Sequence, residues 1–496
     1  MTATLALIAH VVIIGAVIVR VLLRPGRDPA SRVAWILFIA TLPIVGAVAY
    51  VLLGEVHPGG HPERRGVFAE SGAPQAGRDV SSASGKDDEG EHRSGHEREH
   101  ERADASRLPQ SVIAGFAAAR SISGYAPVGG NIGVLLADSN TTIEAMVADI
   151  DAATDHVHLL FYIWLADGNG GRMADAMTRA ATRGVTCRVV VDDLGSRAFI
   201  NSEHWAAMDR AGVHLARAQP LRRALRHLLR GRLDVRNHRK IVVIDDRITF
   251  CGSQNCADPE FAVKPKYAPW VDAVVRFEGP IARQNQRLFL QDWRVYTGEH
   301  VDELLQRPVP ERVGPIVAQV IGTGPDSRYS AMPEMFSTLM HAARRELIIS
   351  TPYYVPDESM QAALCASARR GVDTTIVVPA RNDSPFVAAA SRSYYPQLLE
   401  AGVCIHEFNG GLLHTKTLTV DGNVSLIGSA NMDRRSFDLN YENNILLHDK
   451  ALTQDIRARQ HTYIASSTVV SAETVEAWSW HHRLRNNAMA IMGPVL

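Results

Sequence analysis

The stretch "HRKIVVID" at residues 238–245 is repeated as "HTKTLTVD" at residues 414–421, and this repeat indicates how the chain is organised. Each copy is followed, at the same spacing, by a second match: "GSQN" at 252–255 and "GSAN" at 428–431. A single short motif of this kind is expected by chance. Two copies with matching spacing are not explained by two histidines that merely fill a core, so the repeat predicts two similar structural halves in one chain.

The similarity between the two halves extends beyond the motif. The stretches "RAATRGVTCRVVVDD" (179–193) and "ASARRGVDTTIVVPA" (366–380) each join a helical pattern to a continuous apolar run. Such runs suit strands that are covered on both faces. The sequence therefore predicts an α/β fold with two halves, 108–310 and 311–496, related by a pseudo-two-fold axis. Each half is expected to be a mixed sheet flanked by helices.

Two apolar runs open the chain, Ala3–Leu23 and Val33–Leu53. A helix of about 20 residues crosses the hydrocarbon layer of a bilayer, so each run is long enough. We therefore predict a transmembrane hairpin over residues 1–55, with spans at about 3–23 and 33–53. Arginines flank the second run on both sides in nearly equal number, so the positive-inside rule leaves the orientation open.

Residues 56–107 are rich in Gly, Ser, Glu, Arg and His and poor in large apolar side chains. This composition predicts a disordered, charged tether. His92, His96 and His100 recur at helical spacing within it. A solvated charged run is favoured over a metal site here, because no apolar surroundings would hold the imidazoles in place. We predict no metal and no cofactor.

The first half carries an insert just before its motif, "LRRALRHLLRGRLDVR" at 221–236. Its leucines recur at helical spacing and arginines fill the positions between them. Two interpretations stay open. One is an interfacial helix over 221–230 that binds anionic lipid headgroups. The other is a helix packed on the domain with a solvated basic face.

The repeated motif can supply the chemistry of a phosphodiester. In a strand, residues i and i+2 share a face, so His238 projects with Lys240 and His414 with Lys416. If the halves meet about a two-fold axis, one imidazole can attack phosphorus while the other protonates the leaving oxygen. Lysines and amides can stabilise charge on the other phosphate oxygens. The candidate phosphate-binding residues are Ser253, Asn255, Ser429 and Asn431.

The aspartates of the motif, Asp245 and Asp421, complete the candidate catalytic set by their place in the repeat. Asp245 nevertheless lies at an odd offset from His238 and about 23 Å along an extended strand, so these aspartates are expected to fix strand ends rather than touch the histidines. A carboxylate is still needed to orient each imidazole. Asp272 and Glu442, at corresponding places in the two halves, are the candidates.

The arrangement resembles the phospholipase D superfamily and, within it, the bacterial cardiolipin synthases. Departures from the usual pattern are Ser253, where a second glycine is frequent, and Thr415, where alanine is frequent; neither removes a catalytic group. The strings that carry the resemblance are "NHRKIVVID" (237–245), "VIGTGPDS" (320–327), "TPYYVPDE" (351–358), "SRSYYPQLLEAGV" (391–403) and "GSANMDRRSFDLNYE" (428–442).

The resemblance implies a phosphatidyltransferase of a bacterial cell (inner) membrane. It would transfer a phosphatidyl group between two phosphatidylglycerol molecules, giving cardiolipin and glycerol through a covalent phosphohistidine. His238 would be the nucleophile and His414 the acid and base. The expected partners are phosphatidylglycerol and other anionic membrane lipids. No nucleic acid is expected as a partner, because a formal net charge of −1 gives the protein no overall attraction for a polyanion.

Other functions stay open at this point. A phospholipase D hydrolase would share every catalytic residue, as would a phosphodiesterase or nuclease. An inactive membrane scaffold is less favoured, because both histidines and both lysines are present. The second phospholipid substrate and the oligomeric state are not indicated.

Overall fold

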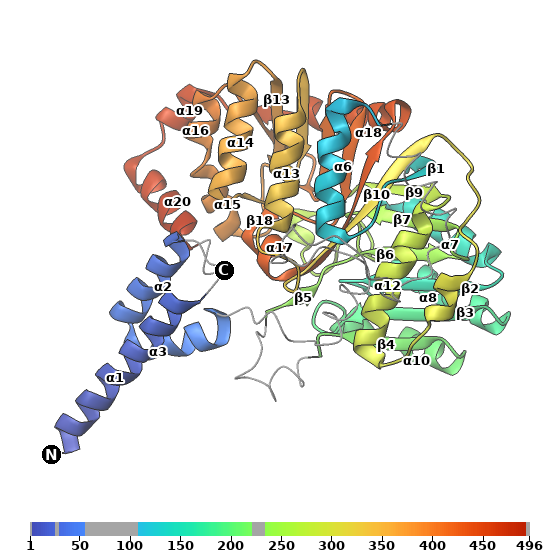
Figure 1. The fold of residues 1–496 in the computed structure, drawn as a ribbon, viewed down its shortest axis with the longest axis horizontal. Helices are drawn as coiled ribbons and strands as arrows, with labels where there is room; N and C mark the ends of the chain where they lie inside the picture. The colour runs from blue at the N-terminus through green and yellow to red at the C-terminus, as the bar shows by residue number, and fades with distance from the viewer. Residues whose placement is uncertain (1, 25–28, 55–107, 221–233, 493–496) are drawn as a thin grey trace, which may run out of the picture.

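The computed structural model describes residues 2–24, 29–54, 108–220 and 234–492 (Figure 1). The predicted tether with its three histidines and the predicted interfacial helix over 221–230 lie outside the described residues. The described part is a mixed α/β protein built on one sheet of 16 strands, which confirms the predicted fold class.

The two halves of the sheet have the same strand order. From the centre outward, the first half runs β1, β9, β7, β6, β2, β3, β4, and the second runs β10, β19, β17, β16, β11, β13, β14, with β20 at the edge. The strands of the first half are β1 (Val128–Leu135), β2 (His156–Phe161), β3 (Thr186–Asp192), β4 (His214–Ala218), β6 (Ile241–Ile244), β7 (Ile248–Gly252) and β9 (Val274–Glu278). Those of the second are β10 (Ile316–Thr323), β11 (Glu346–Ser350), β13 (Asp373–Pro379), β14 (Cys404–Phe408), β16 (Thr417–Val420), β17 (Val424–Gly428), β19 (Asn440–His448) and β20 (Ser467–Val469).

An antiparallel pair, β1 with β10, joins the halves, with Val128 opposite Ala318 and Asn131 opposite Ile316. Each half also contains a parallel group, β2–β3–β4 and β11–β13–β14. The inner strands of these groups are buried along nearly their whole length, as their continuous apolar runs predict.

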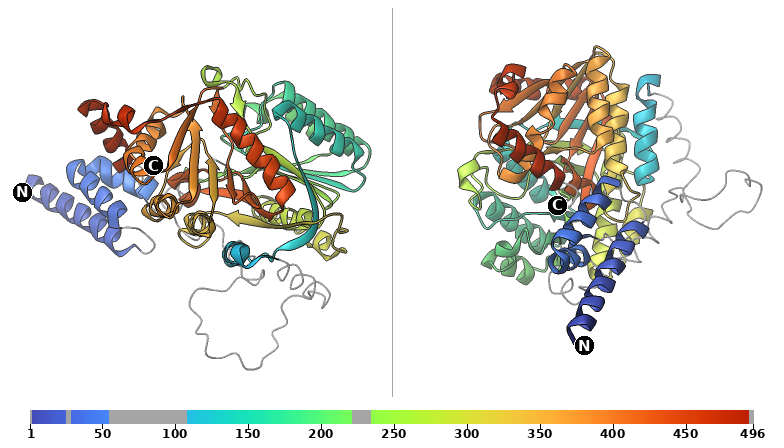
Figure 2. Two further views of the ribbon diagram at one scale, coloured as in Figure 1. Left: turned by 90° about the horizontal axis from the view of Figure 1, so that it is seen from above. Right: turned by 90° about the vertical axis from the view of Figure 1, so that its left-hand side faces the viewer.

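Helices cover both faces of the sheet (Figure 2). The crossing helices α8 and α14 each end before a glycine, Gly184 and Gly371, with φ of +92° and +84°. This left-handed conformation is where glycine is favoured, which explains why the "RGV" echo recurs in both halves. The main helices are α6 (Gln110–Ser123), α7 (Ser139–Ala152), α8 (Gly168–Thr182), α10 (Glu203–Arg210), α12 (Ile281–Thr297), α13 (Ala331–Ala342), α14 (Glu358–Arg369), α15 (Pro385–Arg392), α16 (Tyr395–Glu400), α18 (Lys450–Ala465), α19 (Ala472–Glu476) and α20 (Trp480–Met492).

Helix α6 lies within the expected first half, 108–310, but it packs against the second half. This helix lies beside α13 (Figure 1), and Val112 and Phe116 are buried with Met335 and Leu339 in the core of the second half. The chain therefore begins its globular part on the second half and then crosses to the first through β1. In the other direction, Leu452 of α18 packs in a core cluster with residues of the first half.

The N-terminal unit contains α1 (Thr2–Leu23), α2 (Pro29–Thr41), α3 (Pro43–Ala49) and a π-helical turn η1 (Tyr50–Gly54). The run in which we predict the second span, about 33–53, is thus divided among α2, α3 and η1. Pro43 has no N–H to donate to the carbonyl four residues earlier, and the helix breaks at Leu42. Among the residues that the structure describes, no helix has both the length and the apolar character needed to cross a bilayer. The transmembrane hairpin stays a prediction.

A buried guanidinium ties the halves together. Arg239, 1% exposed, donates to Asp292 Oδ2 of the first half at 2.7 Å and to the carbonyl oxygens of Thr323 and Glu442 of the second half at 3.1 and 3.2 Å. Asp292 is fully buried, so its carboxylate has lost the solvation that water would provide. The ion pair with Arg239 offsets part of that cost.

We predict that Arg239→Ala lowers the free energy of unfolding by about 3–5 kcal/mol, because it leaves a buried carboxylate without its guanidinium. Urea unfolding of the purified full chain measures this. The matched control is Arg179→Ala, which removes a half-exposed pair with Asp151 and should cost at most about 1 kcal/mol. Equal losses in the two variants would contradict a buried role for Arg239.

Candidate active site

Two short parallel ladders place the repeated histidines. The strand before His238, β5 (Arg236–Asn237), pairs with the start of β19, with Arg236 opposite Asn440 and Asn237 opposite Tyr441. The His238 amide continues the ladder by donating to the carbonyl of Tyr441 at 2.9 Å. The next residue of β19 is Glu442, so this register sets the Glu442 carboxylate beside the His238 ring.

The second histidine is placed in the same way. The strand before His414, β15 (Leu412–Leu413), pairs in parallel with β8 (Trp270–Val271) of the first half. The His414 amide donates to the carbonyl of Val271 at 2.8 Å, and Asp272 follows directly. Each half therefore supplies the carboxylate for the histidine of the other half. The sequence indicated both carboxylates but not that the pairs cross.

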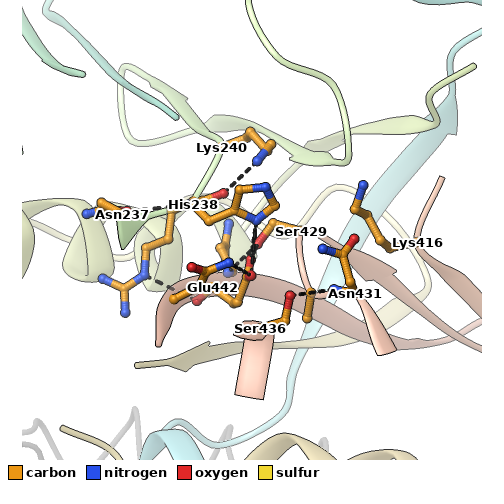
Figure 3. Close-up of polar contacts among 12 residues, drawn as sticks. Asn237, His238, Lys240, Lys416, Ser429, Asn431, Ser436 and Glu442 are labelled. Carbon is orange, nitrogen blue, oxygen red and sulfur yellow. Dashed lines mark hydrogen bonds and ion pairs between the residues drawn. The ribbon is translucent and has the colours of Figure 1, made fainter. Parts of the chain in front are cut away.

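The contacts between rings and carboxylates are short. Nδ1 of His238 lies 3.0 and 2.9 Å from the two carboxylate oxygens of Glu442 (Figure 3), and Nδ1 of His414 lies 2.7 Å from Oδ1 of Asp272. A carboxylate at Nδ1 favours the tautomer with the proton on Nδ1. The lone pair of the neutral imidazole is then on Nε2, as a nucleophile or base requires.

The serines of the GSxN segments hold these carboxylates. The hydroxyl of Ser253 donates to Asp272 Oδ1 at 2.6 Å, and the hydroxyl of Ser429 donates to Glu442 Oε2. A serine has one hydroxyl proton, and both serines are completely buried. Ser253 and Ser429 are therefore hydroxyl partners of the two carboxylates in this structure, and phosphate binding by these serines stays a prediction.

The lysines lie on the same side as their histidines, as the i, i+2 spacing predicts. Nζ of Lys240 donates to the carbonyl of His238, and Nζ of Lys416 to that of His414, each at 2.6 Å. An ammonium has three donors, so each retains N–H groups for a phosphate oxygen. Asn431 lies beside Lys416 (Figure 3). Asn255 and Asn431 stay candidates for phosphate binding through their Nδ2 groups, because only these can donate to a phosphate oxygen; their side-chain oxygens are buried without a hydrogen-bond partner among the described residues.

Burial and crowding of cations shift the pKa values of the basic groups. Desolvation lowers the pKa of Lys416 to about 7 and that of Lys240 to about 8. Desolvation, with the charges of Lys240 and Lys416, lowers the pKa of His238 well below its ordinary value. Desolvation and Lys416 also lower the pKa of His414. An anion bound between these groups would relieve the repulsion, so the arrangement favours a phosphate.

The two carboxylates differ. Desolvation raises the pKa of Glu442 to about 7. Asp272 is also desolvated, but the charge and hydrogen bond of His414 outweigh that effect, so its pKa falls to about 2. Asp272 therefore stays ionised beside His414 and favours an imidazolium there, whereas the His238 imidazole is the more strongly held in its neutral form.

Two aromatic rings line the histidines. The ring centroid of Tyr162, just past the end of β2, lies 4.9 Å from that of His238, and Trp270 lies 4.7 Å from His414. Sequence reasoning missed both. The available signal was position: Tyr162 follows a buried strand of a parallel group, where sites in α/β proteins gather, and Trp270 stands two residues before Asp272.

The motif aspartates lie away from this chemistry. The Asp245 carboxylate accepts backbone N–H bonds from Thr154, Asp155 and His156, each at 2.9 Å, and so fixes the start of β2. Asp421 does the same at the start of β11, accepting from Glu346 N at 3.0 Å. Both have φ of +51°. Both aspartates therefore bond to strand starts in this structure, and their inclusion in the catalytic set stays a prediction.

No group of three or more His, Cys, Asp or Glu side chains that could hold a metal ion is found within the described ranges. The site as it stands can supply a neutral imidazole, an imidazolium, and cations and amides that face the same region. These are the groups that an in-line displacement at phosphorus requires.

Comparison with known proteins agrees with this geometry. Residues 146–293 and 336–462 match the family model described as "Cardiolipin synthase, PLD-like domain", and residues 11–55 match "Phospholipase_D-nuclease N-terminal". Proteins named Cardiolipin synthase A from Yersinia pseudotuberculosis serotype O:1b and from Yersinia pestis are each 34% identical over 497 residues, covering 99% of this chain and 98% of theirs.

Among solved structures, a phosphatidylserine synthase from Haemophilus influenzae Rd KW20 shares the fold. Its TM-score is 0.57 at 13% identity, over 77% of this chain and 100% of that one. The chain belongs to the cardiolipin synthase family of phospholipase D-like proteins.

We predict that Asp421→Ala reduces stability but not the chemistry of the folded protein. Losing the carboxylate leaves backbone N–H groups at the start of β11 without an acceptor, which should cost about 1–3 kcal/mol. Lys416→Ala, in the same segment, should instead lower kcat about 100- to 1,000-fold with little unfolding. Thermal melts and turnover, both taken where the variants are folded, separate the effects. A similar kcat loss in both variants would instead place Asp421 in the catalytic set.

Proposed function

We propose that this member of the cardiolipin synthase family transfers a phosphatidyl group from one phosphatidylglycerol to a hydroxyl of a second, releasing glycerol and forming cardiolipin. The observation that carries the proposal is the pair of crossed histidine–carboxylate contacts in one site with two lysines. The likeness to Cardiolipin synthase A along the full chain supports the choice of substrate.

In the first step, Nε2 of His238 attacks the phosphorus of phosphatidylglycerol. A phosphorus–nitrogen bond forms, and the bond from phosphorus to the glycerol headgroup oxygen breaks. His414, as an imidazolium stabilised by Asp272, gives its Nε2 proton to that oxygen, so glycerol leaves as a neutral alcohol. Lys240, Lys416 and the Asn255 and Asn431 amides stabilise the phosphate oxygens in the transition state.

The second step reverses these roles. Neutral His414 accepts the proton of a headgroup hydroxyl on the second phosphatidylglycerol, and that oxygen attacks the phosphohistidine. The phosphorus–nitrogen bond breaks and returns the electron pair to Nε2 of His238. The assignment of the two roles follows the difference between the two rings: the ionised Asp272 partly offsets the lowering of the His414 pKa, so His414 takes up a proton more readily than His238, whose pKa is lowered further.

The N-terminal unit attaches the enzyme to the bacterial inner membrane in this proposal. Large apolar side chains are exposed along α1, α2 and α3, among them Val12 at 62%, Leu23 at 77% and Ile44 at 71%. Apolar surface of this extent calls for a partner of similar character, and a bilayer supplies it. Membrane attachment would also keep the catalytic part close to its lipid substrates.

The reaction is tested by supplying the purified full chain with phosphatidylglycerol alone. We expect cardiolipin and glycerol in equal amounts, and acid-labile labelling of the protein by phosphorus-labelled substrate that is lost in His238→Ala. Removal of either histidine should lower kcat by about 100- to 10,000-fold, whereas His461→Ala, at an exposed position of α18, should not. Phosphatidic acid as the main product would make the enzyme a hydrolase. Labelling that persists in His238→Ala and disappears in His414→Ala would exchange the two roles.

We also predict a narrow pH profile for kcat/KM, which reports groups of the free enzyme. Protonation of Glu442, whose pKa is raised to about 7, weakens the carboxylate contact that orients His238, so activity should fall as the pH drops through about 7. Lys416 and Lys240 lose their charge as the pH rises through about 7 and about 8, so an alkaline decline should begin there. Lys416→Arg should move that decline upward, because arginine stays charged. An alkaline limb only near pH 10, where ordinary lysines titrate, would contradict this prediction.

A further inference from the structure

The C-terminal helix α20 carries an apolar stripe that the protein does not cover. Trp480, Leu484 and Ile491 are 66%, 60% and 67% exposed. Single exposed apolar residues are ordinary on protein surfaces, but a stripe along one helix is not. At about 100° per residue, Trp480, Leu484, Ala488 and Ile491 fall on one face, and Ala488 is exposed as well.

The opposite face of α20 makes the contact with the protein. The helix packs against α15, and Asn486, which is 1% exposed, points to that side. The helix is therefore held on the domain by one face while its apolar stripe points outward. This orientation is opposite to that of an ordinary surface helix, which turns its apolar face to the core.

The charges next to the stripe are all basic. Arg483 falls on one edge of the stripe and Arg485 on the other, and His481 lies beside the second edge. No acidic residue follows Glu476 in the sequence. Arginines that border an apolar face are suited to the phosphate layer of a bilayer, with the apolar side chains a little deeper.

The position of α20 agrees with this reading. Figure 1 shows α20 on the same side of the molecule as α1, α2 and α3, and the views of Figure 2 agree. The exposed apolar side chains of the N-terminal unit and the stripe of α20 thus lie on one side. A second copy of the chain would be a poorer occupant, because a symmetric contact between two such helices would bring their arginines close together.

We propose that α20 docks in the interface of an anionic bilayer, with Trp480, Leu484 and Ile491 at the level of the upper acyl chains and Arg483 and Arg485 among the phosphates. The inference rests on the membrane attachment proposed above and does not depend on the reaction. It gives the catalytic part a second point of contact with the membrane, distant in sequence from α1–α3, and so limits how the domain can turn over the lipid surface.

The test places an environment-sensitive fluorophore at Leu484→Cys of the full chain, in a Cys404→Ser background, since Cys404 is the exposed native cysteine among the five. The protein is reconstituted at one copy per nanodisc, which excludes a second copy. Nitroxide-bearing lipids then probe depth. Because interfacial helices bury their apolar face about 5–10 Å into the headgroup and acyl boundary, a nitroxide at a shallow acyl position should remove about half or more of the emission.

Two reference positions make the result decisive. The label at Ile13→Cys reports the N-terminal unit, and the label at Glu203→Cys, on an exposed position of α10, should not be quenched. Quenching at Ile13 and Leu484 but not at Glu203 supports the proposal. Quenching at Ile13 alone overturns it and leaves the membrane attachment standing, whereas no quenching at any position overturns both.

Composition of the nanodisc tests the role of the arginines. Quenching at Leu484 should be about twofold or more stronger with phosphatidylglycerol than with phosphatidylcholine alone. Equal quenching would contradict docking to an anionic surface. Trp480→Glu with Leu484→Glu should raise the KM for phosphatidylglycerol in bilayers with kcat unchanged, and Val309→Glu, an exposed apolar position outside α20, is the matched control.

Discussion

The active site depends on the crossing of two parallel ladders, β5 on β19 and β15 on β8. Each ladder is only two residues long, yet it sets the register that brings a histidine of one half to a carboxylate of the other. Neither half supplies both a repeated histidine and the carboxylate beside it. The site therefore forms only when the halves are packed together, and the buried Arg239, which bonds to both, stabilises that packing.

Much of the fold could be predicted because it is local or repeated. Continuous apolar runs specify buried strands, and the side-chain alternation of a strand sets His238 with Lys240 and excludes Asp245 from their face. The crossing could not be predicted, because it comes from pairing between distant segments that have no signal in either half alone: the paired histidine and carboxylate are 204 residues apart in one case and 142 in the other. The partners of the two serines could not be predicted for a related reason. Each hydroxyl bonds to a carboxylate 13 to 19 residues further along the chain, and nothing in the GSxN segments indicates that contact. The interruption of the helix at Leu42 could have been predicted from Pro43, which stands in the middle of the second apolar run.

The repeat is close to symmetric in sequence, but the site that it builds is not. Two residues before Glu442, Asn440 donates to the Glu442 carboxylate at 3.2 Å; two residues before Asp272, Trp270 instead places its ring against His414. Arg239 follows the first histidine, whereas Thr415, with its hydroxyl oxygen buried and without a partner among the described residues, follows the second. The pKa values of the two carboxylates also shift in opposite directions: desolvation raises that of Glu442, whereas His414 and Lys416 lower that of Asp272. A duplicated motif can in this way divide the roles of nucleophile and proton donor between its copies.

The seam of β1 and β10 at the middle of the sheet has a mechanical consequence. Because β1 and β10 pair across the middle, although with a register shift between Val128 and Asn131, one sheet continues through both halves, and the halves are not two separate bodies joined by a hinge. The continuous sheet and the two ladders then hold the histidines, carboxylates and lysines in one arrangement for both steps of the proposed reaction, so the two alcohols would exchange at a preformed site and not through a movement of one half against the other.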